Sequence, residues 1–421
     1  MVNRSFTLWI FIFLFLSLPL KAKVIELYPN QVSGSMSLLI QGFRLYRVKN
    51  QTELEPIPFQ IDEKVDLEQG KRNWALYAFD GGKIPRPNGL WDGDEPLLFL
   101  EKDGGSIWQG SKPEASKFFW ELDLKNGFYL YLSWSESPGP LSQKKYLDFD
   151  PKKDLVSTEI YEVGFDSKNA LIQDRMLFKK AVMPKNILDR FKVRLNIAIR
   201  NFFDLSVNED GLKSKRVGYQ LGPIRLIREV RAWKNLSFIK LIPKTKIDYY
   251  YYPSWAEMPA TVNNPLDGPS QLDPETSGVM GMDFRRMAAG SVFFSNVQEK
   301  PWILGKGRSE NFLPQAKKAL SWFSLSGLAG SMVLKIDNDP KLEALGVQLS
   351  LNILESLEAA PPENEKGQIL IGFSMPFHKI PKGRYQIKLK QVFAKGFKPG
   401  EEESILNQAK LLKFEGSIRA L

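Results

Sequence analysis

Alternation of apolar and polar residues is the feature that most constrains the fold of this chain. In Phe191–Val207 (FKVRLNIAIRNFFDLSV), apolar residues occupy every second position at Val193, Leu195, Ile197 and Ile199. Successive side chains of a strand point to opposite faces, so this period of two predicts a strand with one buried face. The same alternation, and the lack of helices alternating with parallel strands, predict an all-β, mainly antiparallel protein.

Two parts of the chain differ in the length of their predicted strands. Residues 23–150 hold short apolar runs separated by Gly and Pro, a pattern typical of a β-sandwich. Longer runs follow. We therefore expect an N-terminal β-sandwich over residues 23–150 and a larger β-sheet or sandwich domain over residues 151–421. Glu402–Leu412 has an apolar stripe at helical spacing and predicts one short C-terminal helix.

The first 22 residues have the features of a signal peptide. Arg4 supplies positive charge, Phe6–Leu20 is apolar, and Leu20-Lys21-Ala22 is an acceptable cleavage site. A transmembrane helix needs about 20 apolar residues, and Pro19 ends this run early. We expect cleavage after Ala22, export to the periplasm or the extracellular space, and no transmembrane span in the mature chain.

The densest group of acidic residues lies within Pro56–Gly105. Asp62 and Glu63 end one apolar run, and further acids follow around an Asp-Gly turn. One interpretation is a hairpin whose charges are solvated. The other is a structural Ca²⁺ site, because tight turns with hard oxygen ligands suit that ion, although Leu90 occupies one position of the usual loop pattern. The candidate calcium ligands are Asn88, Asp92, Asp94 and Glu95; no other cofactor is expected.

Several short sequence motifs resemble a pattern found in uncharacterised exported bacterial β-sandwich proteins. The pattern runs P-x-Q-x-D-E and later N-G-x-x-D-x-x-D-E-L-x-F, and Pro96 stands where it has Leu. The group has no established activity to carry over. Similar motifs in exported proteins linked to polysaccharide use imply a glycan ligand. The segments of this chain that carry the resemblance are Pro58–Glu63, Asn88–Glu95, Leu97–Leu100, Gly222–Arg228 and Gly281–Phe284.

A second candidate site combines aromatic and charged residues. Four tyrosines, Tyr249–Tyr252, precede Trp255, and a polar, Pro-rich segment at 262–278 predicts a long loop. The tyrosines either pack within a sheet or form a wall on which sugar rings stack. Charged residues follow the loop, so loop, rings and charges would then share one cleft. The candidate ligand-binding residues are Tyr250, Tyr252, Trp255, Asp283, Arg285 and Arg286.

Composition narrows the possible functions. The chain has no Cys and one His, His378, and its 58 basic and 48 acidic residues are interspersed despite a net charge of +10. This distribution does not indicate a nucleic-acid partner. No motif of a serine hydrolase, zinc enzyme or nucleotide enzyme is present. We favour non-catalytic binding of a glycan or another anionic envelope component. The alternatives are a polysaccharide hydrolase or lyase using carboxylate or tyrosine chemistry, and a structural envelope assembly factor.

Overall fold

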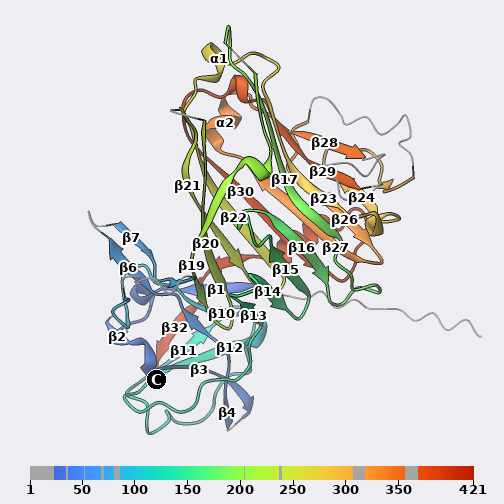
Figure 1. Ribbon diagram of the computed structural model, residues 1–421. Coiled ribbons are helices and arrows are strands. Elements are labelled where there is room, and N and C mark those ends of the chain that lie inside the picture. The colour runs from blue at the N-terminus through green and yellow to red at the C-terminus, as the bar shows by residue number, and fades with distance from the viewer. Residues whose placement is uncertain are drawn as a thin grey trace, which may run out of the picture.

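The structure, a computed structural model, describes residues 23–34, 37–51, 53–67, 71–79, 86–202, 204–236, 239–306, 318–355 and 368–421. The predicted signal peptide lies outside these residues. The protein is all-β, as predicted, with mostly antiparallel sheets (Figure 1). In the described part, no helix is long and apolar enough to cross a membrane. Its α-helices are short: α1 (Gly268–Gln271), α2 (Pro340–Ala344) and α3 (Glu402–Gln408).

Two sheets form the N-terminal sandwich, and apolar side chains such as Leu27, Leu45, Phe99 and Leu132 fill the space between them. The inner N-terminal sheet consists, in spatial order, of β31 (Leu411–Lys413), β1 (Val24–Leu27), β10 (Leu97–Leu100) and β5 (Gln60–Ile61). The outer N-terminal sheet consists of β32 (Ser417–Ala420), β11 (Phe118–Asp123), β12 (Tyr129–Trp134), β3 (Phe43–Asn50) and β4 (Glu53–Pro56).

The C-terminal strands belong to this N-terminal sandwich. β31 pairs with β1 in parallel, and β32 pairs with β11 in antiparallel orientation. The expected division into residues 23–150 and 151–421 therefore misses the last strands, which return after α3 to cover the edges of β1 and β11. Covering an edge satisfies its backbone N–H and C=O groups.

A ten-stranded sheet, here the long sheet, is the backbone of the larger domain (Figure 1). Its strands, in spatial order, are β25 (Trp302–Ile303), β24 (Val292–Ser295), β26 (Trp322–Gly327), β27 (Gly330–Asp337), β30 (Gly383–Ala394), β22 (Trp255–Asn264), β21 (Ile239–Tyr251), β20 (Leu226–Leu236), β19 (Lys213–Leu221) and β8 (Tyr77–Ala78). The edge strand β8 comes from the N-terminal part of the chain, so the two parts share this sheet.

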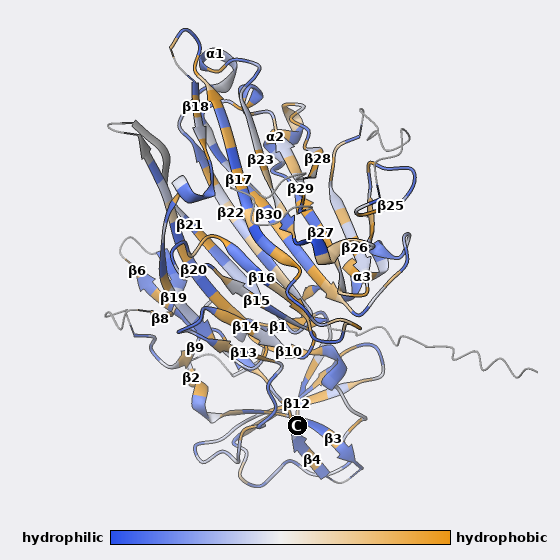
Figure 2. Cartoon of the chain, turned by 45° about the vertical axis from the view of Figure 1, so that its right-hand side comes forward, coloured by the Kyte–Doolittle hydropathy of each residue, from blue (hydrophilic) through white to orange (hydrophobic). Residues whose placement is uncertain are grey.

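Two smaller sheets pack on one face of the long sheet. The five-stranded covering sheet consists of β18 (Asp204–Val207), β17 (Leu188–Ala198), β23 (Ser277–Phe284), β29 (Ile369–Met375) and β28 (Ser350–Glu355). The four-stranded covering sheet consists of β13 (Leu147–Asp150), β14 (Leu155–Thr158), β15 (Tyr161–Phe165) and β16 (Gln173–Phe178). One large apolar core joins all three sheets. Figure 2 shows hydrophilic and hydrophobic residues alternating along the strands of this domain, as the period of two predicts.

The remaining elements are short and connect these sheets. Two-stranded ribbons are formed by β2 (Leu38–Leu39) with β9 (Leu90–Trp91) and by β6 (Lys64–Leu67) with β7 (Lys71–Trp74). Single 3-10 turns are η1 (Pro29–Gln31), η2 (Ile40–Gly42), η4 (Glu101–Asp103), η5 (Glu209–Gly211), η6 (Arg286–Ala288) and η8 (Phe377–Lys379). The loop predicted at 262–278 is shorter than expected, because β22 continues to Asn264 and α1 occupies part of the connection.

Candidate ligand-binding cavity

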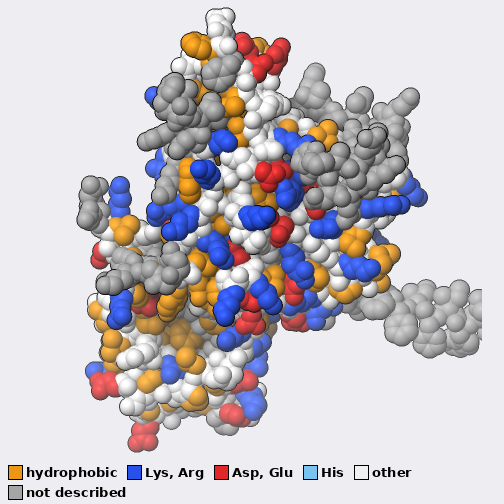
Figure 3. Space-filling view, viewed as in Figure 1, with side chains coloured by type: hydrophobic (Ala, Val, Ile, Leu, Met, Phe, Trp, Pro, Cys, Tyr) orange, Lys and Arg blue, Asp and Glu red, His pale blue; other side chains and the backbone are white. Residues whose placement is uncertain are grey.

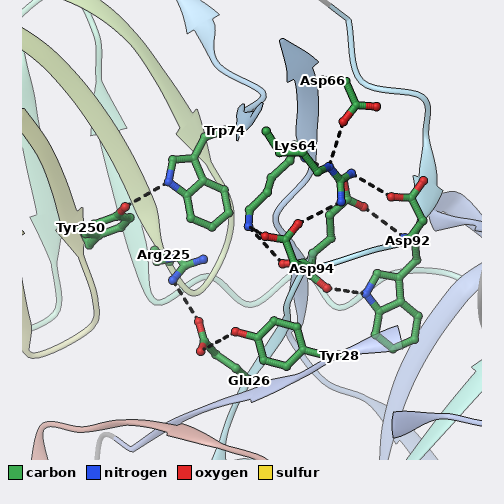
Figure 4. Close-up of polar contacts among 12 residues, drawn as sticks. Glu26, Tyr28, Lys64, Asp66, Trp74, Asp92, Asp94, Arg225 and Tyr250 are labelled. Atoms are coloured by element: carbon green, nitrogen blue, oxygen red, sulfur yellow. Dashed lines mark hydrogen bonds and ion pairs between the residues drawn. The ribbon is translucent and has the colours of Figure 1, made fainter. Parts of the chain in front are cut away.

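The four predicted calcium ligands, Asn88, Asp92, Asp94 and Glu95, lie close together before β10: Asn88 Nδ2 donates to Asp92 Oδ2 at 2.7 Å, and the backbone N–H of Asp92 donates to Glu95 Oε2 at 3.3 Å. Figure 4 shows Asp92 and Asp94. The guanidinium of Arg72, from β7, lies among them, 2.8 Å from Asp92 Oδ1, 2.9 Å from Asp94 Oδ1 and 3.1 Å from Glu95 Oε1. Lys64 also pairs with Asp94. Two side chains thus supply the positive charge that we expected from a metal. Calcium binding stays a prediction, and it requires the ion to displace Arg72.

Glu95 is the buried member of this cluster, with 0% of its side chain exposed. Burial raises the pKa of its carboxyl group to about 7, and the nearby Asp92 also raises it. The backbone N–H groups of Lys64 and Asp92 and the charge of Arg72 oppose this shift. The Glu95 carboxyl group therefore exchanges its proton near neutral pH.

Gln60 and Asp62 hold the N-terminal sandwich to the long sheet. Gln60 Oε1 accepts hydrogen bonds from the backbone N–H of Ile224 at 3.0 Å and of Arg225 at 2.8 Å. Arg225 Nε donates to Asp62 Oδ2 at 2.7 Å, and both side chains are nearly fully buried. A Cβ at Gly222 would lie 2.2 Å from Gln60 Cδ, so only glycine fits there. Two of the segments that carry the resemblance, Pro58–Glu63 and Gly222–Arg228, therefore contact each other directly.

The aromatic run Tyr249–Trp255, which spans the end of β21 and the start of β22, packs at the same junction. The rings of Tyr252 and Trp255 stack with centroids 4.3 Å apart, and their exposed fractions are 1% and 0%. Trp74 Nε1 donates to the Tyr250 hydroxyl at 3.0 Å (Figure 4). Leu98 and Leu100 of β10 share an apolar cluster with Tyr252 and Trp255, while Leu97 and Phe99 face the core of the sandwich, so every residue of β10 is buried. Tyr252 and Trp255 therefore do not present an open wall to a sugar.

The charged residues of the same predicted cleft lie in a different sheet. Asp283, on β23, is 1% exposed and pairs with Lys192 Nζ at 2.5 Å. Arg285 pairs with Asp189 at 3.3 Å, and Arg286 is exposed at the start of η6. The connection that holds α1 follows the far end of β22, nine residues from Trp255. The structure therefore does not gather the six candidate residues into one cleft.

A cavity lies elsewhere, between the long sheet and β17 and β23 of the five-stranded covering sheet. Its volume is about 220 Å³. The wall on the β17 side consists of alternate residues, Phe191, Val193, Leu195 and Ile197, and its length is about 20 Å at roughly 3.3 Å per residue. These are the apolar positions that the period of two identified.

Small and flexible side chains of the long sheet form the opposite wall. Ala232, Thr245 and Ile247 come from β20 and β21, and Met258 and Ala260 come from β22. α1 and η8 lie at the same end of the domain, and residues next to these elements complete the lining. The other lining residues are Leu171, Leu212, Val262, Asn263, Asn264, Pro265, Leu266, Leu272, Thr276, Met280, Leu342, Met375, Phe377, Ile380, Tyr385 and Ile387.

No charged residue lines this cavity among the residues that the structure describes, and apolar groups dominate the lining. Folded proteins rarely keep voids larger than a water molecule. An engineered apolar cavity of about 150 Å³ binds benzene. The space therefore suits a slender apolar group.

Several lining residues are only half-buried although they face the space between the sheets. Leu195, Ile197, Met258 and Ala260 all fall in this class. Water and small molecules can therefore reach part of the cavity. Figure 3 shows apolar side chains at the surface near α1, and both signs of charge spread over the visible face.

Comparisons with known proteins assign no function to this cavity. No protein-family model matches the sequence. A curated relative, the potassium/proton antiporter CemA of Adiantum capillus-veneris, is 21% identical over 245 residues, which cover 52% of this chain and 49% of CemA. The chain thus spans about half the length of this relative.

Two solved structures are weakly similar to this chain. An α-mannosidase from Enterococcus faecalis V583 is 9% identical with a TM-score of 0.46, covering 95% of this chain and 43% of that one. A glycosyl hydrolase family 38 protein from Enterococcus faecalis is 10% identical with a TM-score of 0.45, covering 96% and 48%. These values show no membership of either family.

Proposed function

We propose that this chain is a non-catalytic, exported binding protein whose ligand places an apolar chain in the cavity between the long sheet and β17. The observation that carries the proposal is the volume of about 220 Å³ enclosed by almost wholly apolar walls. Burying one methylene group of a ligand contributes about 0.8 kcal/mol, so a chain of several carbons would be held firmly.

The apolar lining of the cavity favours a lipid over a free glycan as the ligand. A glycan site needs aromatic faces together with polar groups that bind hydroxyls. The cavity lining instead consists mainly of aliphatic side chains, with Thr245, Thr276 and Asn264 as examples of its few polar members. The Asn264 amide already donates to the carbonyl of Ile380. An acyl chain makes no hydrogen bonds and matches such walls.

Titration with N-phenyl-1-naphthylamine, a neutral dye that fluoresces in apolar surroundings, tests the proposal. The wild-type protein should bind the dye, and Ala260→Phe should weaken binding by about tenfold or more, because the new ring fills the cavity. Thr261→Phe is the matched control, since Thr261 is the next residue on β22 and points to the opposite face.

Two further results decide the outcome. A saturated 16-carbon alcohol should displace the dye and raise the melting temperature, because a ligand that binds only the folded state stabilises it. Equal dye affinity in wild type and Ala260→Phe, or no dye binding by a folded wild-type protein, would contradict the proposal.

A further inference from the structure

Lys234, on β20, is a cation near residues that line the cavity, although it is not itself part of the lining. Inward-facing residues of β20 occur at alternate positions as far as Ala232, with Val230 in the core and Ala232 in the cavity wall, and the register with β21 shifts on both sides of Lys234. Lys234 follows two residues after Ala232 and is half-buried. Its Nζ would lie 3.1 Å from a Cβ placed on Gly211, the residue before the cavity-lining Leu212. The ammonium group therefore reaches across from the long sheet to the turn η5.

The acids of this turn pair with another residue. Arg190 Nη1 lies 3.1 Å from Asp210 and 3.9 Å from Glu209. Glu209 also accepts a hydrogen bond from the backbone N–H of Val193 at 3.2 Å. Within the described residues, Lys234 forms no ion pair. Its ammonium group is thus not paired with either carboxylate of this turn.

Arg228, a second inward-facing cation on β20, is a buried cation whose charge is paired within the protein. Arg228 is fully buried, and its Nε donates to Asp154 Oδ1 at 2.7 Å, with a further hydrogen bond to the carbonyl of Ala170 at 2.9 Å. Burial of a charge normally requires such partners. Lys234 is half-buried, and no described carboxylate pairs with it as Asp154 pairs with Arg228.

We propose that Lys234 binds the anionic head group of the ligand whose apolar chain occupies the cavity. The ligand is then a single-chain anionic amphiphile, either a free fatty acid or a phosphate-bearing lysolipid. This inference rests on the proposed function, since it needs the chain in the cavity. Charge-assisted hydrogen bonds from an ammonium group to a carboxylate or phosphate are stronger than those between neutral groups.

Competition against N-phenyl-1-naphthylamine tests this assignment with three probes of similar chain length. They are palmitate, 1-palmitoyl lysophosphatidate and neutral hexadecanol. In Lys234→Met, the affinity for the anionic probes should fall about tenfold, while that for hexadecanol stays within about twofold. Lys234→Arg should restore most of the anionic affinity, because it keeps the positive charge. Preference for palmitate or for the lysophosphatidate identifies the source of the anion.

Lys213→Met is the matched control. Lys213 is exposed on the neighbouring strand β19, where it pairs in register with Trp233 and faces away from the cavity. Its substitution should leave the affinity for all three probes unchanged. Equal losses for Lys234→Met and Lys213→Met, or an equal loss for palmitate and hexadecanol, would overturn the role of Lys234 while leaving the cavity itself intact. Failure of wild type to bind any probe would instead overturn the proposed function.

Discussion

The strands β21 and β22 have two ends that differ in how completely their surroundings are filled. At the end next to the N-terminal sandwich, Tyr252 and Trp255 stack and Arg225 pairs with Asp62, leaving these side chains almost wholly buried. At the other end, Ala260 and Thr245 face a cavity. Trp255 points to the opposite face of β22 from Ala260, so on the cavity-side face it is the rings of Tyr249 and Tyr251, 7% and 2% exposed, that fill the closed end. Bulky rings close one end of the sheet, and small residues leave space at the other.

Breaking the ion pair at the closed end should have the largest effect. Asp62→Ala leaves the buried Arg225 without its main partner, and loss of one member of a buried pair costs roughly 3–5 kcal/mol. Urea unfolding measures this loss. Asp94→Ala is the control, since Asp94 is 59% exposed and its ion pairs should contribute less than about 1 kcal/mol. Similar losses in the two variants would show that the closed end is not held by this pair.

Truncating one leucine at each end compares packing directly. Leu98 is 0% exposed in the closed end, so Leu98→Ala should cost roughly 2–5 kcal/mol. Leu195 is half-buried beside an existing cavity, so it has fewer neighbours to lose, and Leu195→Ala should cost only about 1 kcal/mol. Thermal or urea unfolding of both variants gives the comparison. A larger loss for Leu195→Ala would mean that the cavity end is as tightly packed as the closed end.

The smallest expected effect concerns the pH dependence of stability at Glu95. Its pKa in the folded protein is about 7, above the ordinary value of 4.5, so folding favours the protonated form. The resulting stabilisation is fully present below about pH 4.5 and is lost as the pH rises through 7. Wild type should therefore lose of order 1 kcal/mol relative to Glu95→Gln between pH 6 and pH 8.

Measuring dye affinity shows whether the titration of Glu95 affects the cavity as well as the stability. Because Glu95 lies near the closed end, its titration should change the unfolding free energy without changing binding of N-phenyl-1-naphthylamine in Glu95→Gln. A parallel pH dependence of stability in wild type and Glu95→Gln would contradict the raised pKa of Glu95.

Sequence patterns predicted the local structure better than the position of the site. The alternation in Phe191–Val207 identified the inward face of β17, and those residues line the cavity. The turn that gathers Asn88 to Glu95 was also predicted, because its residues are close in sequence. Arg72 was not, since the two-stranded ribbon of β6 and β7 brings it back to the turn.

Features that depend on distant strands could not be predicted. Trp255 is buried because β1 and β10, far away in sequence, pack over it. The cavity exists because Ala232 and Ala260, on different strands, both face β17. Neither small residue stands out in the sequence, whereas clustered acids and tyrosines do. The clustered acids and tyrosines instead lie at the junction between the N-terminal sandwich and the long sheet.

The pairing of β1 with β31 also determines when the protein can fold. Val24 lies beside Leu411, so β1 acquires this neighbour only after the chain has been synthesised as far as Leu411. Contacts between residues so far apart in sequence form slowly. Until then, β1 and β11 have open edges that can pair with other chains. A nascent chain that stalls before residue 411 would thus be prone to aggregate, and a chaperone that shields these edges would raise the yield of the native protein.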